Sequence, residues 1–533
     1  MEKYPLNLFE RQAISFVLKK EVYMHKIQQI ISNYKNGIHD GIVSVCCSNK
    51  FVIEAAMDKL RDKDIALLVE ATANQVDEFV GYTGMKPSEY RRFILELCKK
   101  NNPGEVEFHQ TVEEVLSSLV PVMEKHPEYE KAAILERLTE PERGITFRVV
   151  WTDDNGNVQV NKGYRYQFNS AIGPYKGGLR FAPNVYPGII KFLGFEQIFK
   201  NSLTGLPIGG GKGGADFDPN GKSDAEIMRF CQAFMTELYR HIGPETDVPA
   251  GDLGVGAREV GYMFGQYKRL VNRFEGVLTG KGLSYGGLQG RTEATGYGIV
   301  FFANAMLEAN GEKLVGKEVA ISGFGNVAWG TAQKLNELGA KLVTISGPDG
   351  YIYDPNGISG EKVDYMLELR ASGKNVCAPY ADKFPGSKFV AGKKPWEVKA
   401  DLYIPCATQN EILLDDAKAI VANGCKFVCE GSNMSSTNEA IKYLQDNGII
   451  VGPSKAANAG GVACSCIEMG QNSGKTVFTP EQVYAQLKDI MVGIHDACAN
   501  ASQTYGFGYN LVAGANIAGF LKVADAMMAQ GLV

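Results

Sequence analysis

Three lysines and one aspartate stand among glycines in a short part of the chain. They occur in the segments GPYKGGLR (Lys176), FKNSL (Lys200), PIGGGKGG (Lys212) and DVPAGD (Asp252). Because glycine has no side chain, a ligand can come close to a lysine that glycines flank. Burial or a neighbouring positive charge lowers the pKa of a lysine, which then acts as a base. We therefore predict that Lys212 is a general base and that the other two lysines bind anions.

For any single lysine, the alternative is a solvated residue in a glycine-rich surface turn, since most lysines lie at the surface. Asp252 has an equally ordinary alternative as a helix cap or a turn residue. Together, and combined with the nucleotide-binding pattern described below, the four residues favour a site.

Length and composition describe a soluble protein of more than one domain. With 533 residues the chain exceeds one ordinary core, so two or three domains are expected. The residues are 45% hydrophobic and 22% charged, as in globular proteins. A net charge of −5 without a basic tract argues against nucleic acid or an anionic membrane as a partner.

No segment predicts a membrane span, a secretion signal or a metal site. The first residues, MEKYPLNLFERQ, lack the apolar core of a signal peptide, and no run approaches the roughly 18 uncharged apolar residues of a membrane helix. The eleven cysteines and six histidines are scattered without metal-ligand spacing. We expect a cytoplasmic protein with reduced, mostly buried cysteines.

The segment 317–349 has the pattern of a dinucleotide-binding unit. An apolar run at 319–322 meets a glycine turn, and a helical stretch with one apolar face leads to a second apolar run at 342–345. In a strand–turn–helix–strand unit, the GxGxxA pattern favours dinucleotide binding over a purely structural turn. Its second glycine would admit the pyrophosphate to the helix N-terminus. The residues predicted to contact the cofactor in this turn are Gly323, Gly325, Asn326, Val327 and Ala328.

The end of the second strand bears on the choice between NAD and NADP. Ser346 and Gly347 stand where an acidic residue usually binds the ribose 2′-hydroxyl, and Asp349 follows slightly later. No arginine or lysine is placed at this turn to bind a 2′-phosphate. These residues favour NAD, with NADP as the alternative.

Three more strands are expected downstream, within DLYIPCATQN (401–410), CKFVCEGSN (425–433) and GIIVGPSKAANAGG (448–461). Each ends in small or amide residues, including Asn433 and Asn458, as strands that face a nicotinamide do. The second half of the chain therefore predicts a Rossmann-type, doubly wound α/β domain.

Five long motifs resemble those of the hexameric glutamate dehydrogenases, within the Glu/Leu/Phe/Val dehydrogenase family. They are RYQFNSAIGPYKGGLRF, KFLGFEQIFKNSLTGLPIGGGKGGADFDP, FCQAFMTELYRHIGPETDVPAGDLGVGAREVGYM, GFGNVAWG and PSKAANAGGVACSCIEM. The resemblance runs from about residue 92 to the C-terminus. It implies a two-domain α/β enzyme, assembled as a homohexamer, that converts glutamate reversibly to 2-oxoglutarate and ammonium with NAD or NADP.

The resemblance also implies roles for the matching residues in substrate binding. Lys176 with Ser465 would hold the side-chain carboxylate, and Lys200 with Gln197 would hold the α-carboxylate, because two carboxylates require two separate cations. The complete set of implied substrate-binding residues is Lys176, Gln197, Lys200, Ala250, Val462 and Ser465.

The implied chemistry lies with four further residues. Lys212 would be the base that activates water, and Asp252 would transfer protons at the α-amino group. Thr295 and Asn326 would position the nicotinamide carboxamide. The stretch SGPDGYIYDP after the second strand resembles the NAD-preferring members of the family.

Two alternatives to a glutamate dehydrogenase follow from the same sequence. A relative acting on an apolar amino acid would leave Lys176 and Ser465 unpaired in a closed cleft. A non-catalytic fusion scaffold would be expected to lack Lys212 or Asp252, and both are present. Departures from the family pattern occur at Leu288, Gln289 and Thr292, at 186–188, and at Ser432 with 434–436, and they spare the named chemical residues.

Residues 1–91 do not resemble the dehydrogenases. Within them, KNGIHDGIVSVCCSNKFVIEAAMDKLRDKDIALLVEATANQVDEFVGYTGMKPSEYRRF resembles the start of the tagatose-bisphosphate aldolase accessory subunits, which are TIM barrels. Strands are expected at 41–46 and 65–70, with a helix at 52–63 between them. A complete barrel needs roughly 250 residues, so we interpret this segment as a fused fragment without aldolase-related function.

We therefore expect three parts in the chain. The N-terminal fragment occupies 1–91, a substrate-binding and oligomerisation domain occupies 92–285 together with a C-terminal helix at 512–533, and the nucleotide domain occupies 286–511. A helix over 224–241 is expected to begin with a capping box formed by Ser223 and Glu226.

Overall fold

The computed structural model describes residues 43–46, 67–70, 86–373 and 376–532. The chain divides into two compact units, Met1–Tyr90 and Arg91–Val533, and the division falls within helix α4 (Pro87–Asn101).

In the first unit, β1 (Val43–Cys46) pairs in parallel with β2 (Leu67–Glu70). Both strands lie where the sequence predicts strands. The helix expected at 52–63 lies outside the described residues.

The second unit contains a five-stranded sheet in the order β3-β4-β6-β5-β7. These strands are β3 (Arg143–Thr152), β4 (Val158–Asn169), β5 (Tyr175–Phe181), β6 (Gly209–Ala215) and β7 (Asp247–Gly251). Strand β4 is antiparallel to both β3 and β6, whereas β5 is parallel to both β6 and β7. Two lysine-bearing strands, β5 and β6, therefore lie side by side in the sheet.

Helices cover both faces of this sheet. On one face, α8 (Pro187–Leu203) packs against β6 and β4, and α5 (Val106–Lys125) packs against α8. On the other face, α9 (Asp224–Leu238) and α10 (Ala257–Val271) pack on an apolar cluster that includes Phe181 and Ala215. Because α8 covers the face of β6 that bears Lys212, one helix and one strand bring Lys200 and Lys212 together.

The capping box at Ser223 is confirmed, since the Ser223 side chain accepts from the amide of Glu226 and the Glu226 side chain accepts from that of Ser223. The predicted extent of this helix, 224–241, is too long. The α-helix ends at Leu238, and Tyr239–His241 form a tighter 3₁₀ turn, as helix ends often do. Short helices α6 (Pro127–Lys131) and α7 (Ile134–Leu138) link α5 to the sheet.

The nucleotide domain is built on a seven-stranded sheet in the order β11-β10-β9-β8-β12-β13-β14. Its parallel strands are β8 (Glu318–Ile321), β9 (Lys341–Gly347), β12 (Leu402–Ile404), β13 (Phe427–Cys429) and β14 (Ile450–Gly452). Two antiparallel strands, β10 (Gly350–Tyr353) and β11 (Lys388–Ala391), extend one edge. All five parallel strands fall within or overlap the segments that the sequence predicts.

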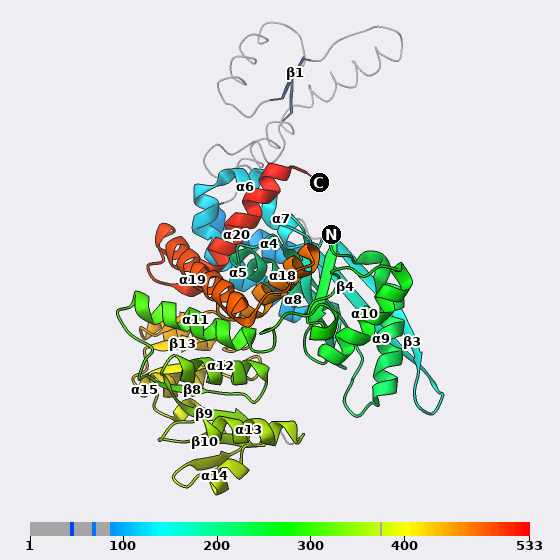
Figure 1. The fold of residues 1–533 in the computed structure, drawn as a ribbon. Coiled ribbons are helices and arrows are strands. Elements are labelled where there is room, and N and C mark those ends of the chain that lie inside the picture. The colour runs from blue at the N-terminus through cyan, green and yellow to red at the C-terminus, as the bar shows by residue number, and fades with distance from the viewer. Residues whose placement is uncertain (1–42, 47–66, 71–85, 374–375, 533) are drawn as a thin grey trace. The chain divides into compact units, whose positions relative to one another are not determined.

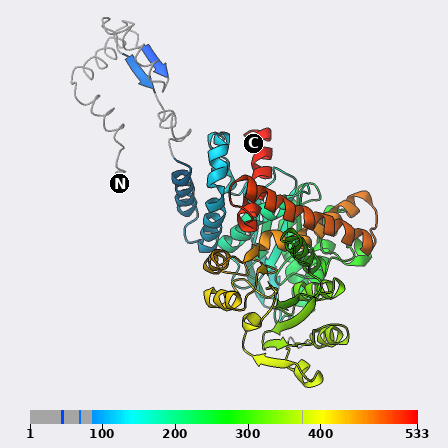
Figure 2. The same cartoon turned by 90° about the vertical axis from the view of Figure 1, so that its left-hand side faces the viewer.

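Helices pack on both faces of this sheet, which makes it doubly wound (Figures 1 and 2). Leu402 and Ile404 join a core with α11 (Ala294–Ala309), α12 (Asn326–Glu337), α18 (Gly460–Gly474) and α19 (Pro480–Thr504). Between them along the strand, Tyr403 joins a second core with α15 (Leu414–Ala422) and α16 (Asn438–Asp446). The alternation along β12 thus places a separate core on each face. The remaining elements are α13 (Glu361–Ala371), α14 (Pro379–Lys383), α17 (Ser454–Ala457), η3 (Leu283–Tyr285) and η4 (Pro395–Glu397).

Among the described residues one helix, α20 (Leu511–Gln530), is long and apolar enough to span a membrane by length and composition. It packs on α19, α8, α5 and β14, and 61% of its most apolar window is buried. Its apolar residues include Ile517, Phe520 and Val523, which are fully buried. Packing inside the protein accounts for the composition of this helix.

Candidate active site

The predicted base and the predicted proton-transfer group are in contact. Lys212 lies on β6 and Asp252 directly follows β7, and the lysine Nζ is 3.3 Å from the carboxylate. The same carboxylate oxygen, Oδ2, accepts from Nε of Arg180 at 2.8 Å. Asp252 therefore lies between two cations, of which sequence reasoning identified only the lysine.

Charge and burial set the protonation of this pair. Burial lowers the pKa of Lys212 below its ordinary value; Asp252 opposes this shift, and Arg180 adds to it. For Asp252, burial raises the pKa, but the charges of Lys212 and Arg180 outweigh burial and hold it well below its usual range. An ionised carboxylate beside an amine that readily loses its proton is suited to proton transfer.

The two other lysines have unusually acidic ammonium groups. Burial, with the nearby charges of Arg291 and Arg165, lowers the pKa of Lys176 to about 7. Burial and the charge of Lys212 lower the pKa of Lys200 to about 8. Neither ammonium makes a hydrogen bond or ion pair with any residue that the structure describes. Both are therefore available to bind an anion.

The glycines in this region are required by the packing of the strands as well as by access to the lysines. A Cβ on Gly177 would lie 1.7 Å from the carbonyl oxygen of Gly211 on the neighbouring strand. A Cβ on Gly178 would lie 2.8 Å from Cβ of Asp252 and 3.3 Å from Nζ of Lys212. Position 177 thus requires glycine because β5 and β6 approach each other closely there, a reason that the sequence pattern did not indicate.

A buried ion pair fixes the strand that carries Lys176. The guanidinium of Arg165 on β4 pairs with the carboxylate of Asp247 at the start of β7, and both side chains are fully buried. Arg165 also donates to the carbonyl oxygen of Gly177 at 3.0 Å. This arginine therefore joins β4, β5 and β7 behind the lysine.

Arg291 is a further cation near Lys176. Arg291 donates from Nε to the hydroxyl of Ser465 at 3.2 Å, and its charge contributes to the lowered pKa of Lys176. Ser465 and Val462 lie one turn apart on α18, and Ala250 pairs with Gly178 in the sheet. Arg291 thus links these two predicted residues, since it contacts Ser465 and its charge acts on Lys176. The repeated glycines drew attention to the lysines, whereas nothing local in RTEATGYG marked this arginine.

The Gly323 turn has the geometry that a dinucleotide needs. Gly323 has φ +95°, and a Cβ there would lie 2.7 Å from the carbonyl oxygen of Cys406. Gly325 precedes α12, caps it without a side chain, and has open space where a Cβ would project. The N-terminus of α12 is therefore uncrowded at Gly325, and phosphate oxygens bind at helix N-termini of this kind.

Two known protein families match the second unit of the chain. Residues 141–269 match the dimerisation domain of the Glu/Leu/Phe/Val dehydrogenases, and residues 286–531 match the Glutamate/Leucine/Phenylalanine/Valine dehydrogenase domain. The chain belongs to this family.

Several relatives of this dehydrogenase family have been characterised. The NAD-specific glutamate dehydrogenase of Clostridium symbiosum is 62% identical over 448 residues, covering 84% of this chain and 99% of that protein. The NADP-specific glutamate dehydrogenase of Haemophilus influenzae is 55% identical, covering 83% and 98%. A solved Plasmodium falciparum glutamate dehydrogenase is 51% identical with a TM-score of 0.82, covering 84% and 96%. The two-domain α/β architecture expected from the sequence is confirmed.

The N-terminal part matches a different family. Residues 27–108 match the D-tagatose-1,6-bisphosphate aldolase subunit GatZ/KbaZ-like family. This agrees with the resemblance seen in the sequence. The matched range extends beyond Tyr90 into α4 and the start of α5.

Two residues predicted to contact the cofactor of this dehydrogenase follow strands of the sheet: Asn433 lies after β13, and Asn458 lies after β14, just before α18. The side-chain nitrogen Nδ2 of Asn458 donates to the carbonyl oxygen of Gly431 at 3.2 Å and to Oδ1 of Asn433 at 2.9 Å. Oδ1 of Asn458 is buried without a hydrogen-bond partner among the described residues. Thr295 on α11 approaches this region, since its Oγ1 would lie 2.5 Å from a Cβ on Gly461. An unpaired acceptor here fits the amide of a nicotinamide.

Asn326 lies in a different position from these residues. It is the first residue of α12, and its Oδ1 accepts from Arg370 of α13 at 2.9 Å. Arg370 also donates to the carbonyl oxygen of Phe324 in the glycine turn at 2.7 Å. The structure therefore joins Asn326 to the phosphate-binding turn through an arginine that the local sequence pattern did not reveal. Val327 and Ala328 follow Asn326 in the first turn of α12, and Ala328 is fully buried, as close helix–strand packing requires.

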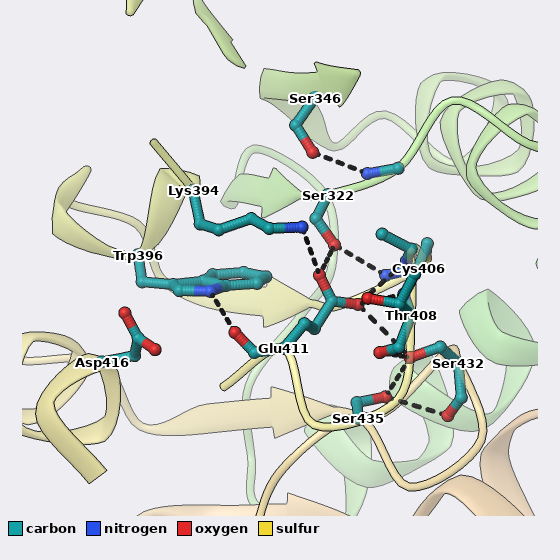
Figure 3. Close-up of polar contacts among 12 residues, drawn as sticks. Ser322, Ser346, Lys394, Trp396, Cys406, Thr408, Glu411, Asp416, Ser432 and Ser435 are labelled. Carbon is teal, nitrogen blue, oxygen red and sulfur yellow. Dashed lines mark hydrogen bonds and ion pairs between the residues drawn. The ribbon is translucent and has the colours of Figure 1, made fainter. Parts of the chain in front are cut away.

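Ser346 and Asp349, which the sequence assigned to the ribose, have partners within the domain. The Ser346 hydroxyl accepts from the amide of Gly323 at 2.8 Å, so it supports the glycine turn (Figure 3). The Asp349 carboxylate accepts from the backbone amides of Cys377, at 2.8 and 2.9 Å, and Ala378, at 3.0 Å. Its negative charge remains beside the end of β9.

A buried carboxylate organises the neighbouring strand ends (Figure 3). Glu411 accepts from the Ser322 hydroxyl at 2.6 Å and from the amides of Ala407 and Thr408 at 2.9 and 3.2 Å. Burial raises the pKa of Glu411, while these hydrogen bonds oppose that shift. The Ser322 hydroxyl accepts in turn from the amide of Cys406 at 3.0 Å. Glu411 thus fixes the loop after β12 against the end of β8, beside the cofactor turn.

Proposed function

We propose that this chain is a glutamate dehydrogenase that catalyses the reversible, NAD-dependent oxidative deamination of L-glutamate to 2-oxoglutarate and ammonium. The observation that carries the proposal is the contact of Lys212 with Asp252, beside the buried Lys176 and the partly buried Lys200, whose ammonium groups have no anionic partner among the described residues. The relatives named above are glutamate dehydrogenases over nearly their whole length, which supports the same reaction.

Two cationic positions select a dicarboxylate. Lys176, with Arg291 and Ser465 beside it, receives the side-chain carboxylate of glutamate. Lys200, with Gln197 one turn before it on α8, receives the α-carboxylate. Binding an anion returns positive charge to lysines whose pKa burial has lowered, so substrate binding and lysine protonation are coupled. An apolar side chain would leave the buried Lys176 ammonium without an anionic partner, which disfavours a leucine- or valine-specific enzyme.

Lys212 and Asp252 move the protons of the reaction. NAD, when bound, accepts the hydride from Cα of the amino acid. Neutral Lys212 takes a proton from the water that adds to the resulting imine carbon, and its lowered pKa makes the neutral amine available. Asp252 is ionised at rest, and it accepts a proton transiently and passes it on as protons move to and from the nitrogen of the departing ammonia. Arg180 keeps the carboxylate in place through its 2.8 Å contact.

The cofactor is held by the Gly323 turn and the first amides of α12, with Asn458, Asn433 and Thr295 toward the nicotinamide. NAD is preferred because Asp349 lies near the end of β9 and repels a 2′-phosphate, while NADP remains the alternative cofactor. Both specificities occur among the relatives.

We further propose a cytoplasmic homohexamer without nucleic acid, membrane or metal partners. The substrate domain takes 92–285 with the C-terminal helix 512–533, and the nucleotide domain takes 286–511. Residues 1–91 form an appendage that the reaction does not require, because every residue assigned to the site lies beyond it.

The test is the appearance of NADH absorbance with purified protein. Glutamate and NAD should give turnover that 2-oxoglutarate, ammonium and NADH reverse. Norleucine, leucine and NADP serve as the competing substrates and cofactor. The matched control is Lys222→Ala, an exposed lysine of the same domain, which should retain activity when Lys212→Ala loses it. Turnover of norleucine equal to that of glutamate would refute the dicarboxylate site.

A further inference from the structure

A polar cavity adjoins α8 at Glu196, one helical turn before Lys200. It has a volume of about 500 Å³ and is lined by residues of α5, α8, α16 and α17, by the strand ends around Glu430 and by the start of α20. It therefore adjoins helices of the substrate domain and elements of the nucleotide domain at once. No residue assigned above to substrate or cofactor lines it.

One buried carboxylate of this cavity has no partner among the described residues. Glu196 on α8 is only 8% exposed and lines the cavity, yet it makes no hydrogen bond or ion pair with the described part of the chain. Burial and the charge of Glu114 raise its pKa, and the charges of Lys455 and Lys200 oppose that shift. A buried carboxylate without a partner is unfavourable unless a cation or a donor reaches it.

Further acceptors lie in the same wall. Glu430 is 2% exposed, and its two oxygens accept from the amides of Ser436 at 2.8 Å and Ser454 at 3.0 Å. Burial raises the pKa of Glu430 to about 7, and the charge of Glu196 contributes to that shift. The Ser436 hydroxyl is buried beside this carboxylate, where it opposes the rise in pKa, and its oxygen accepts no hydrogen bond from the described residues. The wall thus offers oxygens of two acids and one hydroxyl.

The lysines of the lining are already engaged. Lys455 donates to Glu114 at 2.8 Å and to Asn516 at 2.7 Å, and Lys442 pairs with Asp446 at 2.9 Å. The remaining basic residue of the lining, Arg91, makes no ion pair with Glu196. The cavity therefore has acceptor oxygens in excess and lacks a donor for Glu196.

We propose that this cavity binds a small ammonium ion that carries N–H donors, with Glu196 as its charged partner and Ser436 and Glu430 as further acceptors. An N–H-bearing cation supplies the donor that Glu196 lacks. The source is either inorganic ammonium or the head group of a small organic amine. Glu196 directly precedes Gln197 and lies one helical turn before Lys200, so an ion bound here contacts the helix that positions the substrate-binding residues.

The experiment measures the melting temperature of the full-length protein without substrate or cofactor. Chlorides of ammonium, ethylammonium, tetramethylammonium and sodium are compared at equal concentration. We expect ammonium and ethylammonium to raise the melting temperature by roughly 1–3 °C relative to sodium. Tetramethylammonium should have no such effect because it has no N–H donor. A larger rise with ammonium identifies the inorganic ion as the source, and a larger rise with ethylammonium identifies an organic amine.

Variants locate the ion. Glu196→Gln removes the charge with little change of shape and should weaken the apparent affinity at least tenfold. Glu113→Gln is the matched control, since this exposed carboxylate lines the same cavity, and it should keep the rise. Asp252→Asn should also keep it, because the active site lies elsewhere. A rise that survives in Glu196→Gln, is lost in Asp252→Asn, or appears equally with sodium or tetramethylammonium overturns the proposal, as does the absence of any rise.

A second variant tests the same assignment independently of whether Glu196→Gln folds. Ser117 is an exposed residue of α5 that lines the cavity, so Ser117→Lys tethers a primary ammonium there. This variant should no longer respond to added ammonium or ethylammonium. An undiminished response would contradict the assignment. Because no substrate is present, the outcome does not depend on whether the protein is a glutamate dehydrogenase.

Discussion

Replacing Lys176 by methionine should make the folded protein more stable while it impairs the use of glutamate. Lys176 is 1% exposed, and its ammonium has no anionic partner in the described structure without substrate. Burial and the charges of Arg291 and Arg165 lower its pKa from 10.5 to about 7. Methionine has a similar length, fills the same space and carries no charge, so Lys176→Met removes this unfavourable burial.

The size of the effect and its pH dependence follow from that difference in pKa. At 1.36 kcal/mol for each pKa unit, keeping Lys176 charged in the folded state costs at most about 5 kcal/mol. The unfolded chain binds the proton more tightly, so the full cost applies below pH 7, where Lys176 is protonated in both states. Between pH 7 and 10.5 the folded protein carries the neutral amine, and the cost falls to about 2 kcal/mol at pH 9. The stability gain of Lys176→Met should therefore shrink as the pH rises.

The assay is denaturant or thermal unfolding of both proteins at pH 6.5 and pH 9, at one protein concentration because assembly affects apparent stability. Lys222→Met, at an exposed position of the same domain, is the control and should show no comparable dependence on pH. In parallel, kcat/KM for glutamate should fall by about 10²–10³, since a buried carboxylate loses one cation but keeps Arg291. A variant that is less stable than the wild type at pH 6.5, or a gain that is independent of pH, would refute the reasoning.

Three further outcomes are expected. Lys212→Ala should lower kcat by about 10²–10⁴ with little change in NADH affinity, because Asp252 keeps its contact with Arg180; retention of a tenth of wild-type turnover would exclude Lys212 as the base. The ratio of kcat/KM for NAD to that for NADP should exceed one and should fall in Asp349→Ser, since the like charge near a 2′-phosphate is removed; parity in the wild type would contradict the cofactor assignment. Deletion of residues 1–86, which leaves α4 intact, should give a soluble and active enzyme by size exclusion and the NADH assay, and a soluble but inactive product would show that the appendage contributes to the active assembly.

Features that depend on neighbours along the chain could be predicted from the sequence. The turn at Gly323 and the capping box at Ser223 are defined by residues a few positions apart, and both are confirmed. The strands of the nucleotide domain follow from apolar runs that end in small residues. The lysines were found because glycines surround them, although Gly177 proved to serve the contact between β5 and β6.

The residues that sequence reasoning missed act through contacts between distant segments. Arg180 and Asp252 are separated by 72 positions, and Arg291 and Ser465 by 174. Glu411 organises strand ends from the β8 and β12 segments, and only the folded sheet brings these together. A single sequence contains no periodicity or spacing that marks such pairs, because their proximity is a property of the tertiary fold.

Arg180 also explains how Lys212 can serve as a base beside an ionised carboxylate. An isolated pair of lysine and aspartate favours the charged amine, because each charge stabilises the other. Here Asp252 raises the pKa of Lys212, but burial and the charge of Arg180 lower it, and the net direction is downward. The same guanidinium keeps Asp252 ionised after Lys212 has lost its proton. Without Arg180, Lys212 would hold its proton more firmly. Arg180 therefore allows Lys212 to be neutral and act as a base while Asp252 beside it is ionised.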